Sequence, residues 1–554
     1  MSNTILESVI KPYPPINLGL DDINPAIQLF GSRFFSDQTV LEFLVELLLV
    51  AYSPKLLACS SKEISDMRPF NSVFPDRNVL QNWSQNKRLL YAPPARLNLK
   101  LFSFIGASKL ETRHESHKRH YQDILNELRS RIDCDSSGEK DDILRTIENL
   151  FLGFQGAGYD RTWCAQAFIP ISINVLAGET IWKQTKAKHD SVEDWSEALK
   201  YFSQSQHIFL ARGGELLYLQ LCNAIRQSSE EIDSFSRRME ISLNETEADP
   251  LKLYNVLSSV FNAIMTHRLP ALDKIALLID QIDGETARRT DGEGDDERFT
   301  NCGWCPENSW MEGYLFAVEF LRVCQAEIDP IEMIEMLKLC CGFQVLRSLC
   351  AQSARVVPWS KERLSNGNEL GFIWAISPPS GEDSIIKQVS QRNLKATQQL
   401  IYNAIRIPEI KGNVEKYYRK SSIQSLYKEA DTRYGDRFFL SLSKKIGFVV
   451  PKKGPGARFV LSDQIIRYFV LSLIRPGERC TLDTFKDLMF AHYGLAIDGK
   501  YIQKACLWSD YPQLSESAVG NDDWLVQKLR ASGFLIHLSD ACSLVQNPFG
   551  EGGK

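Results

Sequence analysis

The stretch DRFFLSLSKKIGFVVPKKGPGARFVLS, residues 436–462, decides the fold expected for the C-terminal part of this chain. Asp436 suits the start of a helix, and Gly447 suits a left-handed stop at its end. The apolar side chains between them fall near one helical face: Phe438, Phe439, Leu442 and Ile446. A strand, Phe448-Val449-Val450, follows at once. The pattern therefore predicts one helix that runs directly into a β-hairpin.

The same stretch carries positive charge and no acidic side chain between Arg437 and Ser462. Its basic residues are Arg437, Lys444, Lys445, Lys452, Lys453 and Arg458. Two of them, Lys452 and Lys453, precede a Gly-Pro-Gly segment that suits the tip of the hairpin. A surface of this kind is expected to bind a phosphate backbone, and such contacts position a protein without reading bases.

A second copy of the pattern lies nearer the C-terminus. Asp522-Asp523-Trp524 opens a helix that ends at Gly533, and the segments Phe534–Leu538 and Cys542–Val545 form the expected hairpin. In both copies an apolar helix with Lys or Arg ends in Gly-Phe. The pair resembles tandem units of the winged-helix superfamily, over roughly the last quarter of the chain. The resemblance implies a recognition helix followed by a wing in each unit.

Charge separates the two units, expected at residues 401–474 and 475–554. Residues 401–460 hold 13 Lys and Arg against 5 Asp and Glu, whereas residues 475–550 hold 7 against 9. The net charges are +8 and −2, and the first 400 residues carry −11. From this difference in charge we expect the first unit to bind nucleic acid and the second a protein surface. The acidic remainder should repel DNA and so confine the contact to the first hairpin.

Two further basic residues, Arg419 and Lys420, follow Tyr417 and Tyr418 just before the first unit's helices. Aromatic side chains interleaved with charge are typical of surfaces that grip a nucleic-acid strand. The alternative is that the tyrosines pack beneath the wing. Both interpretations remain open, and Arg419 and Lys420 are counted among the candidate nucleic-acid-binding residues.

The rest of the chain predicts a mainly α, multidomain helical scaffold. Apolar side chains recur at three- and four-residue spacing over residues 37–59, 115–132, 140–153, 193–228, 251–282, 308–326 and 329–352. Strand alternation is scarce before residue 448. We expect an N-terminal helical region at 1–105, helical domains at 106–282 and 301–400, and an acidic flexible linker at 283–300.

We expect no segment that would span a membrane or direct secretion. The longest apolar run, Val40–Ala51, contains Glu42 and Glu46 and falls short of the ~20 residues that a bilayer requires. The 13 cysteines lie mostly in apolar segments, as expected of buried thiols in a reducing compartment. Cys302 and Cys305 have a metal-ligand spacing but would need two more ligands. We expect a cytoplasmic protein without a metal or cofactor.

No catalytic motif stands out: a Walker A sequence, HExxH and Gly-x-Ser-x-Gly are all absent. We therefore expect a non-enzymatic, nucleic-acid-binding scaffold subunit of a larger DNA-processing complex. The chain is loosely similar to accessory proteins encoded beside helicases and ATPases in bacterial anti-phage operons. That likeness implies an ATPase, helicase or nuclease subunit as partner. The alternative is a protein-protein adaptor whose winged helices bind proteins and not DNA.

Overall fold

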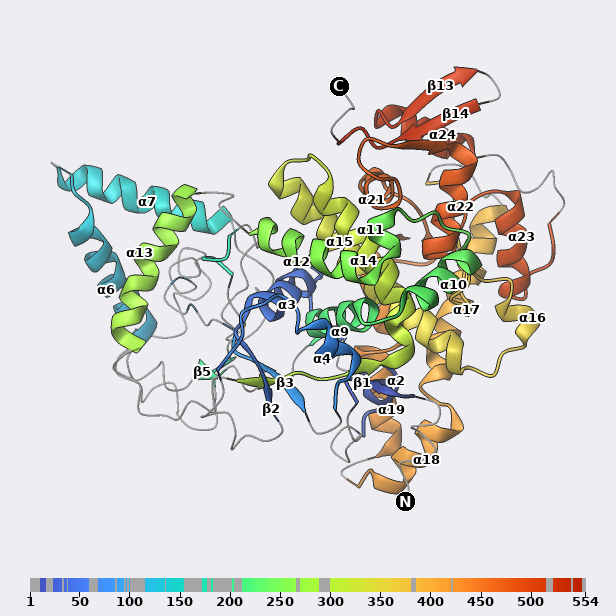
Figure 1. Ribbon diagram of the computed structural model, residues 1–554, viewed down its shortest axis with the longest axis horizontal. Coiled ribbons are helices and arrows are strands. Elements are labelled where there is room, and N and C mark those ends of the chain that lie inside the picture. The colour runs from blue at the N-terminus through green and yellow to red at the C-terminus, as the bar shows by residue number, and fades with distance from the viewer. Residues whose placement is uncertain are drawn as a thin grey trace.

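The computed structural model is mainly helical, with a few small sheets (Figure 1). This confirms the fold class predicted from the sequence. The structure describes residues 10–15, 23–31, 34–36, 38–58, 68–84, 87–93, 96, 99, 115–134, 136–153, 172–176, 181–182, 202–203, 212–265, 270–287, 299–379, 385–419, 422–514, 522–539 and 542–550.

Helix α15 (Pro330–Val356) is the longest described helix and lies at the centre of the fold. Asp329 caps it as expected, since its carboxylate accepts a hydrogen bond of 2.9 Å from the backbone N–H of Ile331. The helix continues through Gly342, where an added Cβ would lie 3.2 Å from the Ile446 side chain. Helices from both halves of the chain pack against it: α3 (Val40–Tyr52), α9 (Gly213–Ile225), α14 (Trp310–Gln325) and α17 (Ile385–Ala404).

Every residue of α9 is buried, because α9 lies between α3 and α14. Its first two residues are glycines, and they permit an unusually close contact with α3. A Cβ on Gly214 would lie 2.4 Å from the Phe43 carbonyl oxygen, closer than side chains approach a backbone. The glycine pair therefore serves helix packing.

The other helices before residue 385 surround this core, and α6, α7 and α13 lie together at one end of the molecule (left in Figure 1). They are α2 (Pro25–Phe30), α4 (Arg77–Gln81), α6 (Glu115–Arg131), α7 (Ser137–Gly153), α10 (Ser229–Met239), α11 (Glu245–Ala248), α12 (Pro250–Ile264), α13 (Pro270–Ala287) and α16 (Lys361–Leu364). Among all the helices that the structure describes, none combines the length and apolar character needed to cross a membrane.

Short strands occur before residue 448, although the sequence showed little alternation there. They are β1 (Pro12–Tyr13), β2 (Lys55–Ala58), β3 (Arg88–Tyr91), β4 (Ile181–Trp182), β5 (Phe202–Ser203), β6 (Thr300–Asn301), β7 (Cys305–Pro306) and β8 (Trp374–Ala375). The antiparallel pairs β1–β7 and β3–β6 join the N-terminal region to residues 300–306. Because α13 extends to Ala287, the linker expected at 283–300 has regular structure at both ends; residues 288–298 lie outside the described part.

The C-terminal part contains two successive helix-hairpin units. In the first, α18 (Pro408–Tyr417), α19 (Ile423–Arg433) and α20 (Asp436–Lys445) precede the antiparallel pair β9 (Val449–Val450) and β10 (Arg458–Phe459). Helix α21 (Asp463–Leu473) follows. The second contains β11 (Arg479–Thr481), α22 (Leu482–Tyr493), β12 (Leu495–Ala496), α23 (Gly499–Trp508), α24 (Asp523–Ala531), β13 (Leu535–Ser539) and β14 (Cys542–Gln546).

Strand β14 pairs with both β11 and β13, so the second hairpin belongs to a three-stranded sheet. The parallel pair β8–β12 joins the second unit to the segment before α17, and Ile376 of that segment forms an isolated bridge with Phe459 of β10. One cluster of buried apolar side chains runs through the N-terminal region, the helical centre and both units, from Ile10 to Val545. This arrangement is compatible with the expected winged helices, whose assignment and boundaries stay predictions.

Candidate nucleic-acid interface

Helix α20 ends as the sequence predicts but begins one residue differently. Gly435 occupies the N-cap position, and Asp436 is the first helical residue, with no side-chain cap. Burial, together with the nearby Asp431, raises the pKa of Asp436 above its usual range. At the other end Gly447 has φ +78°, and the Phe448 N–H bonds the Ser443 carbonyl at 2.9 Å, which closes the helix.

The second unit repeats this junction. Gly533 has φ +76°, and the Phe534 N–H bonds the Leu529 carbonyl at 2.9 Å. Strands β13 and β14 then cover the hairpin expected from the sequence. The likeness of the two Gly-Phe segments thus reflects the same helix-ending geometry.

Aromatic packing fixes the base of the first hairpin. The Phe448 ring lies 4.9 Å from Phe459 across the strand pair, 5.3 Å from Trp374 of β8 and 5.1 Å from Phe343 of α15, measured between centroids. All four side chains are buried. Packing of this kind holds the hairpin rigidly on the molecule.

The tip of the hairpin, by contrast, faces solvent. Lys452 and Lys453 are exposed. Gly454 and Gly456 follow with φ of +95° and +83°, a backbone region that favours glycine. A Cβ on Gly456 would lie 3.6 Å from the Gln391 amide of α17, so the tip bends back beside this helix.

The other candidates on α20 and the hairpin differ in their surroundings. Arg437 is exposed and donates a 3.4 Å hydrogen bond to Thr432 Oγ1, while Lys444 is half-buried. Lys445 Nζ donates to the Ser36 carbonyl at 3.0 Å and so binds the N-terminal region to α20. Arg458, at the base of the hairpin, is half-buried, and its Nε has no hydrogen-bond acceptor among the described atoms.

Arg419 lies at the end of α18, away from the hairpin in sequence. Its Nη1 donates to the carbonyls of Glu415 and Tyr418 at 3.1 and 3.2 Å, although the side chain stays exposed. Helix α18 packs against α2, and Asn413 Nδ2 donates to Gln28 Oε1 at 3.0 Å. Lys420 lies outside the described residues.

Part of the positive charge of the first unit is not neutralised within the described structure. Five side chains there form no ion pair with a described carboxylate: Arg437, Lys444, Lys452, Lys453 and Arg458. The carboxylate of Asp431 is already engaged, since both its oxygens accept hydrogen bonds of 2.8 Å from Arg406. The charge of Arg437 lowers the pKa of Asp436, but burial and Asp431 raise it more strongly.

The cations of the second unit are mostly paired. Lys486 Nζ lies 2.8 Å from carboxylate oxygens of both Asp483 and Asp522. Lys528 pairs with Asp463 of α21. Asp522, which precedes α24 at the N-cap position, thus forms an ion pair, and its side chain makes no capping hydrogen bond. These contacts neutralise part of the positive charge of this unit, whereas the exposed Arg479 and Arg530 form no ion pair with a described carboxylate.

Cys302 and Cys305 do not form a metal centre in the described structure. Burial raises the pKa of the Cys305 thiol to about 12, so it stays protonated at neutral pH. Within the described ranges no group of three or more His, Cys, Asp or Glu side chains is placed to hold an ion. The thiols therefore act as small apolar side chains here.

The shape and charge of the first unit together define its chemistry. A rigid hairpin base carries an exposed cationic tip, and the preceding helix adds Arg437 and Lys444 on the same continuous segment. Such a surface suits an extended array of negative charges.

No protein-family model, curated protein or solved structure matches this chain.

Proposed function

We propose that this protein binds a nucleic-acid backbone through α20 and the β9–β10 hairpin. The observation that carries the proposal is the set of five cations on this segment that pair with no described carboxylate. A charge already paired within the protein gains little from a phosphate, whereas an unpaired one releases counterions from the nucleic acid when it binds. DNA is the proposed partner, contacted through its backbone.

The helical remainder acts in this proposal as a non-enzymatic scaffold. Support comes from the continuous core, which joins the first unit to helices throughout the chain and gives the hairpin a rigid base. We place the protein in the cytoplasm, in a larger DNA-processing complex with an ATPase, helicase or nuclease subunit. A role in bacterial anti-phage defence belongs to the same proposal and rests on the sequence likeness alone.

Fluorescence anisotropy with labelled duplex and single-stranded oligonucleotides tests the proposal. The variant Lys452→Glu/Lys453→Glu changes two exposed side chains at the tip. We expect its affinity at 0.1 M salt to fall by roughly 30-fold or more, and the slope of log K against log salt to become shallower by about 2. A similar loss on oligonucleotides of different sequence would indicate backbone contacts.

The matched control is Lys274→Glu/Lys361→Glu, which reverses two exposed charges on α13 and α16. It changes the net charge by the same amount and should leave the affinity within about twofold. Equal losses in both double variants would mean that only net charge matters, and the proposal would then fail.

The adaptor alternative has one observation in its favour. The second unit pairs Lys486 with its own Asp522 and carries Leu538 at 60% exposure on its hairpin, which suits a protein partner better than a phosphate backbone. If the wild-type protein binds neither duplex nor single strands, the free cations of the first unit would instead face an acidic protein. Pull-down with and without the tip variant would then identify that contact.

A further inference from the structure

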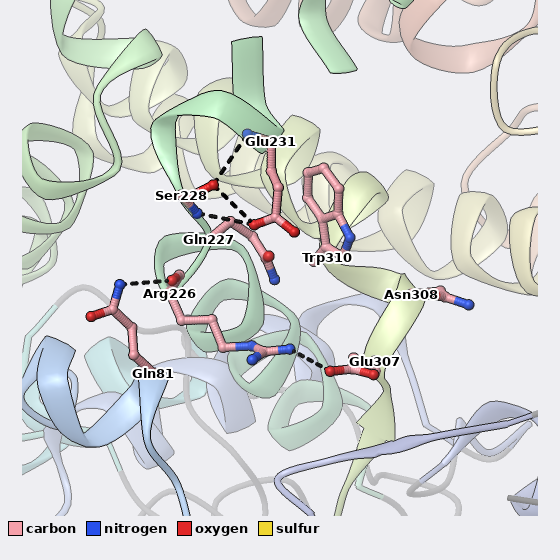
Figure 2. A pocket seen from close by; sticks show the side chains of 8 residues that line it. All are labelled: Gln81, Arg226, Gln227, Ser228, Glu231, Glu307, Asn308 and Trp310. Carbon is pink, nitrogen blue, oxygen red and sulfur yellow. Dashed lines mark hydrogen bonds and ion pairs between the residues drawn. The ribbon is translucent and has the colours of Figure 1, made fainter. Parts of the chain in front are cut away.

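A polar pocket lies far along the chain from the basic hairpin, where α9 ends and α10 begins (Figure 2). Helix α4 and a single 3-10 turn, η5 (Glu307–Ser309), complete its walls. Its lining includes Gln81, Arg226, Glu231, Glu307, Asn308 and Trp310. One cation and two carboxylates therefore face a common space.

The one cation of this lining is held in place by three contacts within the protein. Arg226 Nη2 donates to Glu307 Oε1 at 3.0 Å, and its Nε donates to Asn223 Oδ1 at 2.9 Å. The guanidinium also stacks over the Tyr13 ring, 4.5 Å from its centroid. Arg226 is thus held in place as a wall of the pocket, and its charge is paired with that of Glu307.

The carboxylates keep acceptor capacity. Glu231 Oε2 accepts from the backbone N–H and the hydroxyl of Ser228 in a capping box, at 3.1 and 3.3 Å. Neither Glu231 Oε1 nor Glu307 Oε2 accepts a hydrogen bond from the described residues, and Glu231 is exposed. With Arg226 paired to Glu307, the lining keeps a net charge of −1.

Trp310 adds an aromatic wall. Its ring is half-buried and forms a T-shaped contact with the Phe235 ring, at 5.4 Å between centroids. Tryptophan offers the strongest cation-π surface among the aromatic side chains, and a guanidinium is planar enough to stack on it while it donates to a carboxylate. An ammonium would satisfy the charge but would not match the stacking geometry as well.

We infer that this pocket binds a guanidinium group. The group would stack on the Trp310 indole and donate to Glu231 Oε1, with Glu307 Oε2 as a second acceptor. The source of the group is either a small guanidinium compound or an arginine side chain of a peptide. This inference does not depend on the nucleic-acid proposal, because none of its residues belongs to the basic hairpin.

Isothermal titration calorimetry of the full chain tests it with three probes. They are N-acetyl-arginine amide, its lysine counterpart and an unstructured peptide with one arginine. We expect saturable binding of the arginine amide at millimolar concentration or tighter, and about fivefold weaker binding of the lysine amide. A peptide that binds at least tenfold tighter than the amide identifies a peptide as the source, and equal affinities identify the small compound.

The variants separate the pocket from general electrostatics. Glu231→Gln removes the charge and keeps a capping box, because glutamine also serves that position. We expect about a fivefold loss for Glu231→Gln and a comparable loss for Trp310→Leu. The control Glu230→Gln removes a neighbouring exposed charge that does not line the pocket and should change binding less than twofold. No saturable binding, or equal losses in Glu230→Gln and Glu231→Gln, would overturn the inference.

Discussion

The two helix-hairpin units share a backbone motif and differ in what their charges do. Both end a helix with a left-handed glycine, Gly447 or Gly533, and enter a hairpin through a buried phenylalanine. In the first unit the cations on the helix and the tip face solvent without a described acidic partner. In the second unit, Lys486 pairs with Asp522 of the same unit, and Lys528 pairs with Asp463 of α21. A common backbone motif therefore carries two different arrangements of charge.

A buried polar network connects the second unit to the helical centre. The Glu319 carboxylate of α14 accepts two hydrogen bonds from Arg347 of α15, at 2.7 and 2.8 Å. It also contacts His492 Nδ1 at 2.7 Å and accepts from the Tyr493 hydroxyl at 2.6 Å, both at the end of α22. The buried charges of this network, on α14 and α15, thus serve structure, whereas those on the first hairpin remain available to a partner.

The largest expected effect comes from removing the cation of this network. Arg347→Met leaves the fully buried Glu319 without its bidentate partner, and loss of one member of a buried pair costs about 3–5 kcal/mol. Urea denaturation should show this loss in the free energy of unfolding. Arg437→Met, which removes an exposed cation of the first unit, is the control and should cost under about 0.5 kcal/mol. Equal costs would erase the distinction between the buried network and the exposed cations of the first unit.

Local sequence patterns predicted the helices and strands of this fold better than they predicted the surroundings of individual side chains. The helix-Gly-Phe-hairpin pattern, the capped start of α15 and the buried α3 are visible in the spacing of apolar, capping and glycine residues. These features depend on interactions within a few residues. Sequence inspection therefore found both hairpins and the exposed tip lysines.

Contacts between distant segments were not predictable in the same way. The Ser36 carbonyl that binds Lys445 lies 409 residues away along the chain, and the Asp431–Arg406 pair has no local signature. The pairing of Glu319 with Arg347, His492 and Tyr493 depends on how three helices pack. Asp436 was expected at the N-cap because its residue type suits it, but Gly435 takes that position.

A second, smaller effect concerns the ion pair between Glu247 and Arg475, which lies at the start of the second unit. Burial would raise the pKa of Glu247, but hydrogen bonds and charge from Arg322, with Arg475, lower it from 4.5 to about 2. Arg475 Nη2 lies 2.9 Å from Glu247 Oε2. Because the folded state then holds this carboxylate in its charged form, the pair stabilises the protein above pH 4.5 and loses that effect as the pH falls towards 2.

Glu247→Gln should therefore cost about 3 kcal/mol at neutral pH. The difference from wild type should shrink as the pH is lowered from 4.5 to 2, since both proteins then carry a neutral side chain at this position. Chemical denaturation across that range measures it. If the free energies of unfolding of the two proteins differed by the same amount at every pH, the charge of the Glu247 carboxylate would not stabilise the fold.

The smallest expected effect concerns the stability of the first hairpin. Lys452→Gln/Lys453→Gln should change the free energy of unfolding by less than about 0.5 kcal/mol, because both side chains are exposed and form no described ion pair. The hairpin base depends on Phe448 and Phe459, which the substitutions leave in place. Thermal and urea unfolding of the variant measure this at low and high salt. A clear gain in stability at low salt would mean that the tip lysines repel one another or neighbouring cations in the free protein. Binding of a polyanion would then relieve that repulsion, and the unpaired charges of this unit would carry a cost that the paired charges of the second unit avoid.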